Sequence, residues 1–294
     1  MTIMNMSRFV TFLSLIALVL FALPSLGFAG QPVDWQMNFQ EAATPVAERL
    51  HSFHHFLLYI ISGICIFVLA LLLYVMIRFN SKTNPVPSAT THNVLLEIIW
   101  TVVPVVILIV IAVPSFKLLY YADRTDKPEM TLKVTGYQWY WGYEYPDNGG
   151  ISFNANMIPT DQINKGENQS QVALLSTDHP VVLPIDTNIQ ILVTGQDVIH
   201  SFAVPSFGIK TDAVPGRINE TWVRITKPGT YYGQCDQLCG TNHGFMPIEV
   251  FAVTKEEFAK WVASQNAGKT PAKAAGDAPA GKKAAAETAA APKE

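Results

Sequence analysis

Two long runs of apolar residues dominate the N-terminal part of the chain. Residues 56–77 and residues 98–119 are each long enough for a membrane-spanning helix, which needs roughly 20 residues. The second run is almost uniformly Val, Ile, Leu and Pro. Its Pro104 and Pro114 would kink a soluble helix, but packing against neighbours in a membrane tolerates them. The pattern therefore predicts a two-helix transmembrane domain over residues 30–123.

A shorter apolar run, residues 9–23, has a different character. It follows a basic residue and ends at a proline, and small residues stand just beyond it at Gly27 and Ala29. A basic start, a short apolar stretch and a small-x-small exit are typical of a secretory signal peptide. A third membrane helix is the alternative, but the run is too short to cross a bilayer comfortably. We expect residues 1–29 to be a signal peptide, cleaved after Ala29 or Gly30.

The short loop between the two spans, residues 79–93, indicates their orientation. It carries Lys82, with Arg78 at the end of the preceding helix, and it holds no acidic residue, whereas the outer flanks of the helices are acidic. Loops rich in Lys and Arg stay preferentially in the cytoplasm. The pattern predicts a protein of the bacterial inner membrane, with both termini outside and the bulk of the chain in the periplasm.

Beyond the second span the pattern changes to short runs rich in β-forming residues. Runs such as 131–135 and 188–194 are separated by turns that contain Gly and Pro, which is typical of a β-sandwich or barrel. We expect this exported domain to occupy residues 124–265 and to end in a short amphipathic helix. Residues 266–294 are almost all Ala, Lys, Pro, Gly and Glu, so they cannot bury enough apolar surface to order themselves and form a disordered tail.

Composition agrees with a membrane protein and narrows the partners. Only 15% of the residues are charged, well below the quarter usual in soluble domains, which favours contact with a lipid bilayer. The net charge of −3 gives no support to a nucleic-acid partner. Three cysteines are too few for a disulfide scaffold, and Cys65, inside an apolar run, is interpreted as a small hydrophobic residue.

The strongest chemical signal is the segment GQCDQLCGTNHGFMP. Within it Cys235, Cys239, His243 and Met246 are spaced four, four and three residues apart, and His200 stands upstream beside a β-run. A ligand loop between two late strands, joined by one histidine from an earlier strand, is how cupredoxin-like sandwiches assemble copper sites. Thiolate, thioether and imidazole together are typical of electron-transfer copper.

Two cysteines indicate more than one metal ion. A single blue-copper site uses one cysteine, whereas Cys235 and Cys239 together can bridge two coppers, each of which keeps one terminal histidine. Zinc is the main competitor, but a structural zinc site rarely recruits methionine. A plain disulfide between the two cysteines is the other alternative in an oxidising periplasm.

At this point the sequence resembles cytochrome c oxidase subunit II, from the segment FQEAATP to about residue 261. The motifs that carry the resemblance are EIIWT from Glu97, QWYW from Gln138, KTDAVPGR from Lys210, and YYGQC from Tyr231 through to MPI at Met246. The resemblance implies a membrane-anchored α+β chain in which a two-helix hairpin precedes a cupredoxin-like Greek-key β-sandwich or barrel. It also implies a dinuclear copper centre, copper A, that accepts electrons one at a time from cytochrome c. Haem in subunit I would then receive them and reduce oxygen to water with proton pumping, and subunit III is a further expected partner.

The resemblance also implies roles for individual residues. The copper ligands would be His200, Cys235, Cys239, His243 and Met246 together with the backbone carbonyl of Gln237. The family usually has glutamate at the position of Gln237, and that carboxylate also reaches a magnesium ion at the boundary with subunit I. A carbonyl ligand survives any side chain, but a neutral amide binds a hard dication more weakly than a carboxylate does, so magnesium is put in doubt.

Five further positions match functional residues of the family. Trp139 would be the exposed tryptophan where the electron enters; aromatic packing in a strand is the alternative for Trp139 and the interpretation adopted for its neighbours. Glu144, Asp178 and Asp197 would form an acidic docking face for basic cytochrome c, or are simply solvated carboxylates. Glu97 would stand at the mouth of a proton path, or is a favourable charge at a helix N-terminus.

Three other classes of function compete with this interpretation. A membrane-tethered copper chaperone or thiol oxidoreductase would be expected to have one membrane helix and a thioredoxin-like βαβ domain. The second subunit of a quinol oxidase has the same architecture without copper ligands, and a purely structural membrane subunit would not need this donor cluster. Two predicted spans, a strand-rich domain and a methionine beside the cysteines favour the oxidase subunit.

Overall fold

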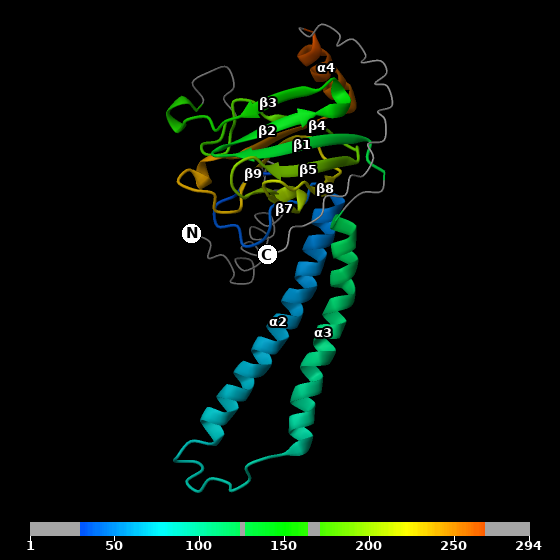
Figure 1. Ribbon diagram of the computed structural model, residues 1–294. Coiled ribbons are helices and arrows are strands. Elements are labelled where there is room, and N and C mark those ends of the chain that lie inside the picture. Colours follow the sequence, from blue (N-terminus) through cyan, green and yellow to red (C-terminus); the bar gives the residue numbers. More distant parts are fainter. Residues whose placement is uncertain (1–29, 124–126, 164–170, 268–294) are drawn as a thin grey trace, which may run out of the picture.

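The computed structural model describes residues 30–123, 127–163 and 171–267. The predicted signal peptide and nearly all of the predicted tail lie outside these residues. Two long helices lead into a β-sandwich, as Figure 1 shows, and the predicted fold class is confirmed. Figure 1 labels most of these helices and strands.

The two helices are α2 (Pro45–Arg78) and α3 (Val94–Asp123), and both are longer than the apolar runs that predicted them. Each contains an apolar stretch of at least 18 residues, none of it buried inside the chain, and is long enough to cross a membrane. Pro104 and Pro114 lie inside α3 without ending it, as packing in a membrane permits.

Thr44 connects the start of α2 to the β domain. Its hydroxyl oxygen accepts a hydrogen bond from the Ala47 backbone N–H at 3.0 Å, which caps the helix, and its O–H donates to the Phe207 carbonyl at 2.7 Å. An N-cap of this kind contributes about 1 kcal/mol to stability. Because Thr44, Val46 and Ala47 are buried, the helix begins inside the β domain and not at its surface.

Ten strands in the described part of the chain form two five-stranded sheets. The first sheet has the order β3-β2-β1-β5-β8 and the second has the order β4-β10-β9-β6-β7. Most neighbours are antiparallel, but β1 pairs with β5 and β4 with β10 in parallel. The strands are β1 (Met130–Tyr137), β2 (Tyr140–Tyr145), β3 (Ile151–Ala155), β4 (Val181–Pro184), β5 (Ile189–Gly195), β6 (His200–Val204), β7 (Ile209–Ala213), β8 (Asn219–Val223), β9 (Gly229–Cys235) and β10 (Ile248–Val253).

Alternating side chains of the two sheets build the core. Residues of β1 and β5 are buried at every second position, the pattern expected where only one face of a sheet is covered. Trp141 and Tyr145 on β2 are fully buried and fill the space between the sheets. The last helix, α4 (Lys255–Asn266), packs Phe258 and Trp261 against Tyr145 at the outer edge.

The strand topology argues against one competing function, that of a copper chaperone or thiol oxidoreductase with a thioredoxin-like domain. Among residues 127–163 and 171–267 no α-helix connects a pair of neighbouring parallel strands, so the thioredoxin-like βαβ unit is absent from that part of the chain. A sandwich of two sheets instead places strand ends and long loops at its edge, where a group of donor side chains can converge.

Candidate metal centre

The register between β6 and β9 creates the site. Phe202 on β6 lies opposite Cys235 on β9, so His200, at the start of β6, comes beside Cys235, at the end of β9, although 35 residues separate them. The loop from β9 to β10 then returns Cys239 and Met246 to the same place. Two strand ends and one loop therefore supply the donors, as the spacing in the sequence predicts.

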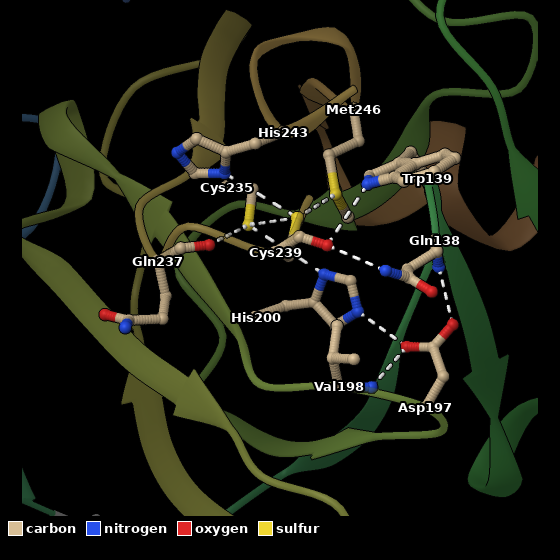
Figure 2. A network of polar contacts seen from close by, with 10 residues as sticks. All are labelled: Gln138, Trp139, Asp197, Val198, His200, Cys235, Gln237, Cys239, His243 and Met246. Carbon is tan, nitrogen blue, oxygen red and sulfur yellow. Dashed lines mark hydrogen bonds and ion pairs between the residues drawn. The ribbon is translucent and has the colours of Figure 1, made fainter. Parts of the chain in front are cut away.

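The candidate donors gather around the two cysteine sulfurs, as Figure 2 shows, and the ligand atoms of His200, Cys235 and Cys239 all lie within 4.8 Å of one another. The Cys235 and Cys239 Sγ atoms are 3.8 Å apart. His200 Nδ1 lies 4.0 Å from the Cys235 sulfur, and His243 Nδ1 lies 3.6 Å from the Cys239 sulfur. Each cysteine therefore has one imidazole at its side.

Two weaker donors complete the cluster. Met246 Sδ lies 3.6 Å from Cys239 Sγ, and the Gln237 carbonyl oxygen lies 3.3 Å from Cys235 Sγ. The donor set is therefore two thiols, two imidazoles, one thioether and one carbonyl. Soft sulfur with imidazole suits copper, and the pairing of one imidazole with each thiol suits two ions that share the thiolates.

Most of the donor residues are buried, His243 is half-buried, and both cysteines are free thiols. His200 is completely buried, and Cys235, Cys239 and Met246 are between 1% and 6% exposed. Burial opposes ionisation of Cys235, but hydrogen bonds from His200 and from nearby backbone groups outweigh it and lower the pKa of this thiol. Burial and the neighbouring Cys235 charge raise the pKa of Cys239. The surrounding groups therefore shift the pKa values of the two thiols in opposite directions.

Asp197 orients His200 from the opposite side of the ring. Its Oδ1 lies 2.8 Å from His200 Nε2, while its Oδ2 accepts the Gln138 backbone N–H at 2.8 Å. Burial raises the pKa of Asp197, yet the bonds from His200, Val198 and Gln138 prevail and lower it overall. With the carboxylate on Nε2, the other nitrogen, Nδ1, faces the Cys235 sulfur, and metal-binding histidines are commonly held in this way by a carboxylate on the nitrogen that does not bind the metal.

Two glycines allow close approach around the ligands. A Cβ at Gly136 would lie 2.8 Å from the His200 ring, so only glycine lets β1 pass beside this ligand. Gly240 has φ +127 and a Cβ there would lie 3.0 Å from the Trp139 indole. The ligand loop can therefore turn directly beneath Trp139.

Trp139 and Gln138 contact the ligand loop from the β1–β2 turn. Trp139 Nε1 donates to the Cys239 carbonyl at 3.3 Å, and Gln138 Nε2 donates to the same oxygen at 2.8 Å. Trp139 is half-buried, so its indole joins the surface to the backbone of a ligand residue. Trp141 is instead fully buried, and its Nε1 donates to the Met246 carbonyl at 3.0 Å, so it packs and fixes the loop as expected.

The other predicted site residues lie apart from this cluster. Glu144 forms an ion pair with Lys133 across β1 and β2 at 3.1 Å, and Asp178 accepts hydrogen bonds from the backbone and side chain of Asn156. Glu97 lies in the first turn of α3, at the far end of the membrane helices from the β domain (Figure 1). The structure therefore joins only Trp139 and Asp197 to the metal ligands.

Sequence reasoning did not find Gln138 or the bond from Asp197 to His200. The Gln138 bond depends on the β1–β2 turn meeting the ligand loop, about a hundred positions along the chain, whereas Asp197 and His200 are three residues apart and meet because of the local path of the β5–β6 turn. The only signal available was their adjacency to Trp139 and His200 in the sequence. Buried Glu249 was also missed; its carboxylate accepts the Thr177 N–H at 2.6 Å and holds the segment that carries Asp178.

The family models and the similar proteins all indicate the same family. The family model for the transmembrane domain of cytochrome c oxidase subunit II matches residues 32–118, and the model for its periplasmic domain matches residues 130–253. A probable cytochrome c oxidase subunit 2 of Rickettsia bellii is 53% identical over 254 residues, which cover 86% of this chain and 92% of the relative. Cytochrome c oxidase subunit 2 of Zea mays is 46% identical over 237 residues, covering 79% and 90%.

One solved structure is also similar in sequence to this chain. The crystal structure of the periplasmic domain of subunit II of cytochrome oxidase from Bradyrhizobium japonicum is 48% identical, with a TM-score of 0.43, and covers 48% of this chain and 96% of that one. The two matched family domains span both the helices and the β domain, and the relatives match over most of their length. This chain therefore belongs to the cytochrome c oxidase subunit II family, whose members are part of an oxidoreductase complex.

Proposed function

We propose that this chain accepts electrons one at a time from cytochrome c at a dinuclear copper centre and passes them to haem in subunit I. There oxygen is reduced to water and protons are pumped. The observation that carries the proposal is the convergence of two free cysteines with one histidine beside each, one thioether and one carbonyl. The acidic outer flanks of the helices and the Lys82 loop support a β domain on the periplasmic side of a bacterial inner membrane.

The residues of the chain fit the role of copper ligands. Two coppers bridged by thiolates would share one electron and change their bond lengths little on reduction, which suits rapid transfer. Cys235 and Cys239 would supply the bridges and His200 and His243 the terminal ligands, while Met246 and the Gln237 carbonyl complete the set. Burial excludes water from the sulfurs, and Asp197 and Trp141 hold His200 and Met246 in place before any metal arrives.

Trp139 is the proposed point where the electron enters. Its half-buried indole reaches the surface, and its N–H donates to the carbonyl of Cys239. A single hydrogen bond therefore connects a half-buried aromatic ring at the surface to a proposed copper ligand. Gln138 donates to the same carbonyl and accordingly fixes the ligand loop against the Trp139 turn.

Docking of cytochrome c is proposed to use acidic groups around Trp139. Asp197 is nearest, because its carboxylate accepts the backbone N–H of Gln138, and its side chain is 34% exposed. Asp178 is 39% exposed, and the buried Glu249 holds its segment in place. Glu144 already pairs with Lys133, so its charge is partly compensated. Complementary charges of this kind raise association rates and lose their effect in salt.

Magnesium, which the family implies at the boundary with subunit I, does not fit this chain as well as copper does. The Gln237 side chain is exposed and points away from the two sulfurs (Figure 2). Its neutral amide is a poor substitute for the carboxylate that a hard dication prefers. The carbonyl of Gln237 fits the copper role, and no step proposed for this chain uses magnesium.

Substitution of a bridging cysteine tests the copper pair. The full-length protein loaded with copper should hold about two ions per chain and give an electron paramagnetic resonance spectrum of one electron shared equally by two coppers. Cys239→Ser should lose the shared signal, because only one thiolate remains. Cys65→Ser is the matched control, since Cys65 lies exposed on α2, and it should leave the spectrum unchanged. A single-copper signal in the unsubstituted protein would contradict the proposal.

Substitution of Trp139 tests the entrance for electrons. In the assembled oxidase, Trp139→Phe should slow electron transfer from bound cytochrome c at least about tenfold, or about 1.4 kcal/mol in activation free energy, with the copper spectrum intact. Trp35→Phe is the control, because Trp35 is 97% exposed on the segment before α2. Stopped-flow oxidation of cytochrome c measures both. Equal rates for the two variants would rule out Trp139.

Salt dependence tests the docking face. Asp178→Asn should reduce the association rate of cytochrome c severalfold at low ionic strength and leave it nearly unchanged at high ionic strength, because salt screens the long-range attraction of the carboxylate that is removed. Asp161→Asn, a change of the same charge at another exposed aspartate of the β domain, serves as the control. If both variants behave alike, net charge and not this face sets the rate.

Glu97 is proposed to admit protons from the cytoplasm, as the family resemblance implies. Its Oε1 accepts the Asn93 N–H at 3.3 Å, which also stabilises the start of α3. Glu97→Gln should therefore slow turnover of the assembled oxidase severalfold while the first electron still arrives from cytochrome c at its normal rate. Asn93→Ala removes the Asn93 Oδ1 cap on the Leu96 N–H but keeps the carboxylate. A matching loss of turnover in Asn93→Ala would assign Glu97 a role in helix capping alone.

A further inference from the structure

A groove lies between α2 and α3 close to the β domain, apart from the metal centre. Its volume is about 490 Å³, and residues of both helices line it. The two helices lie close together at this end and spread apart toward the loop that joins them (Figure 1). The groove therefore lies at the end of the helix pair where the apolar parts of both helices begin.

The lining changes from charged to apolar along the helix axes. Arg49 and Lys117 lie at the end nearer the β domain, and Phe56 and Pro114 lie deeper along the helices. Arg49 and Phe56 are seven residues apart on α2, which corresponds to roughly 10 Å along a helix. The cations therefore lie nearer the β domain, and the aromatic and aliphatic groups lie deeper in the membrane. The headgroup and acyl chains of a phospholipid are arranged in the same order at the membrane surface.

Arg49 is held ready for an anion. Its Cζ lies 3.4 Å from the centre of the Tyr121 ring, and the Trp222 indole N–H donates to the Tyr121 carbonyl at 2.9 Å. The Trp222 ring also packs edge-on against Tyr121 at 5.4 Å. Stacking on an aromatic face leaves the guanidinium N–H groups at the ring edge free to donate, and a planar fork of donors suits phosphate.

The charges around the groove leave a net positive value. Within the described residues neither Arg49 nor Lys117 forms an ion pair, and both side chains are exposed. Glu48 is the one acidic residue of the lining, and it lies in the first turn of α2, where the helix dipole offsets part of its charge. Two cations and one carboxylate favour a ligand with one negative charge.

We propose that this groove binds one anionic phospholipid, whose phosphate lies between Arg49 and Lys117. The first carbons of its acyl chains pack against Phe53, Phe56 and Pro114. The lipid fills the opening between α2 and α3 directly beneath the β domain. Because Tyr121 and Trp222 connect Arg49 to β8, the lipid also supports the contact between the membrane helices and the sheet.

Photocrosslinking in the assembled oxidase tests the site. The complex is placed in nanodiscs with a phosphatidylglycerol that carries a diazirine near the start of one acyl chain, and labelled peptides are mapped by mass spectrometry. Label is expected on the α2 and α3 segments that contain Phe53, Phe56 and Pro114. Each of Arg49→Gln and Lys117→Gln should lower this labelling roughly fivefold, the contribution of one cation near an anionic surface.

Control variants separate recognition from folding. Lys117→Arg keeps the charge and should keep the label, and Lys82→Gln removes a cation from the opposite end of the helices without effect. All variants should retain the copper spectrum, which reports an intact β domain. Labelling that is equal with both cations removed would overturn the proposal, as would crosslinks from these positions to a neighbouring protein chain in place of lipid.

Two further measurements distinguish a lipid headgroup from free phosphate as the group that binds between the two cations. A phosphatidylcholine probe of the same design should label the groove severalfold less than phosphatidylglycerol, because its headgroup carries no net charge. Inorganic phosphate at millimolar concentration should not displace the lipid probe, because it has no acyl chain to pack against Phe53, Phe56 and Pro114. Equal labelling by both lipids would overturn recognition of the charge, and displacement by inorganic phosphate would assign the groove to the free anion.

Discussion

The pairing of β6 with β9 is the contact on which the rest of the site depends. Because Phe202 lies opposite Cys235, His200 comes beside Cys235. The loop that leaves β9 then closes around His200 and Cys235. Backbone hydrogen bonds between two central strands hold this register, and a slip of one residue would turn His200 to the other face of the sheet. Trp141, wedged between the sheets and bonded to the Met246 carbonyl, fixes the other end of the loop.

One hydrogen-bonded network in the β-sandwich connects the ligand loop, the surface indole of Trp139 and the charged group of Asp197. Asp197 contacts His200 and the Gln138 backbone, and Gln138 and Trp139 contact the Cys239 carbonyl. A surface indole, a charged group and the ligand loop are therefore connected, and the Cys239 carbonyl accepts from both Gln138 and Trp139, so the loop keeps one of these bonds when the other is lost. The membrane helices enter this assembly through Thr44 at the start of α2 and through Tyr121 and Trp222 at the end of α3. The proposed lipid occupies the space between those two connections.

Much of this could be predicted from the sequence because the signals are local and strong. Two uninterrupted apolar runs predicted α2 and α3, and the spacing of Cys235, Cys239, His243 and Met246 predicted one cluster that the structure brings together. What the sequence could not supply were contacts that arise only when distant turns meet. Gln138 reaches the Cys239 carbonyl from the β1–β2 turn, and Arg49 stacks on Tyr121 from another helix, and no periodicity links either pair. The family resemblance placed Asp197 on the acidic docking face, whereas its carboxylate also bonds inward to a buried histidine.

X-ray absorption at the copper edge of the copper-loaded protein tests the central claim most directly. If two coppers share the Cys235 and Cys239 thiolates, each copper should show two sulfur neighbours, one imidazole nitrogen and a second copper at short distance. Reduction by one electron should shift these distances little, because the bridges spread the charge. Copper surrounded by one sulfur with no copper neighbour, or protein that takes up no copper while both cysteines are reduced, would contradict the account.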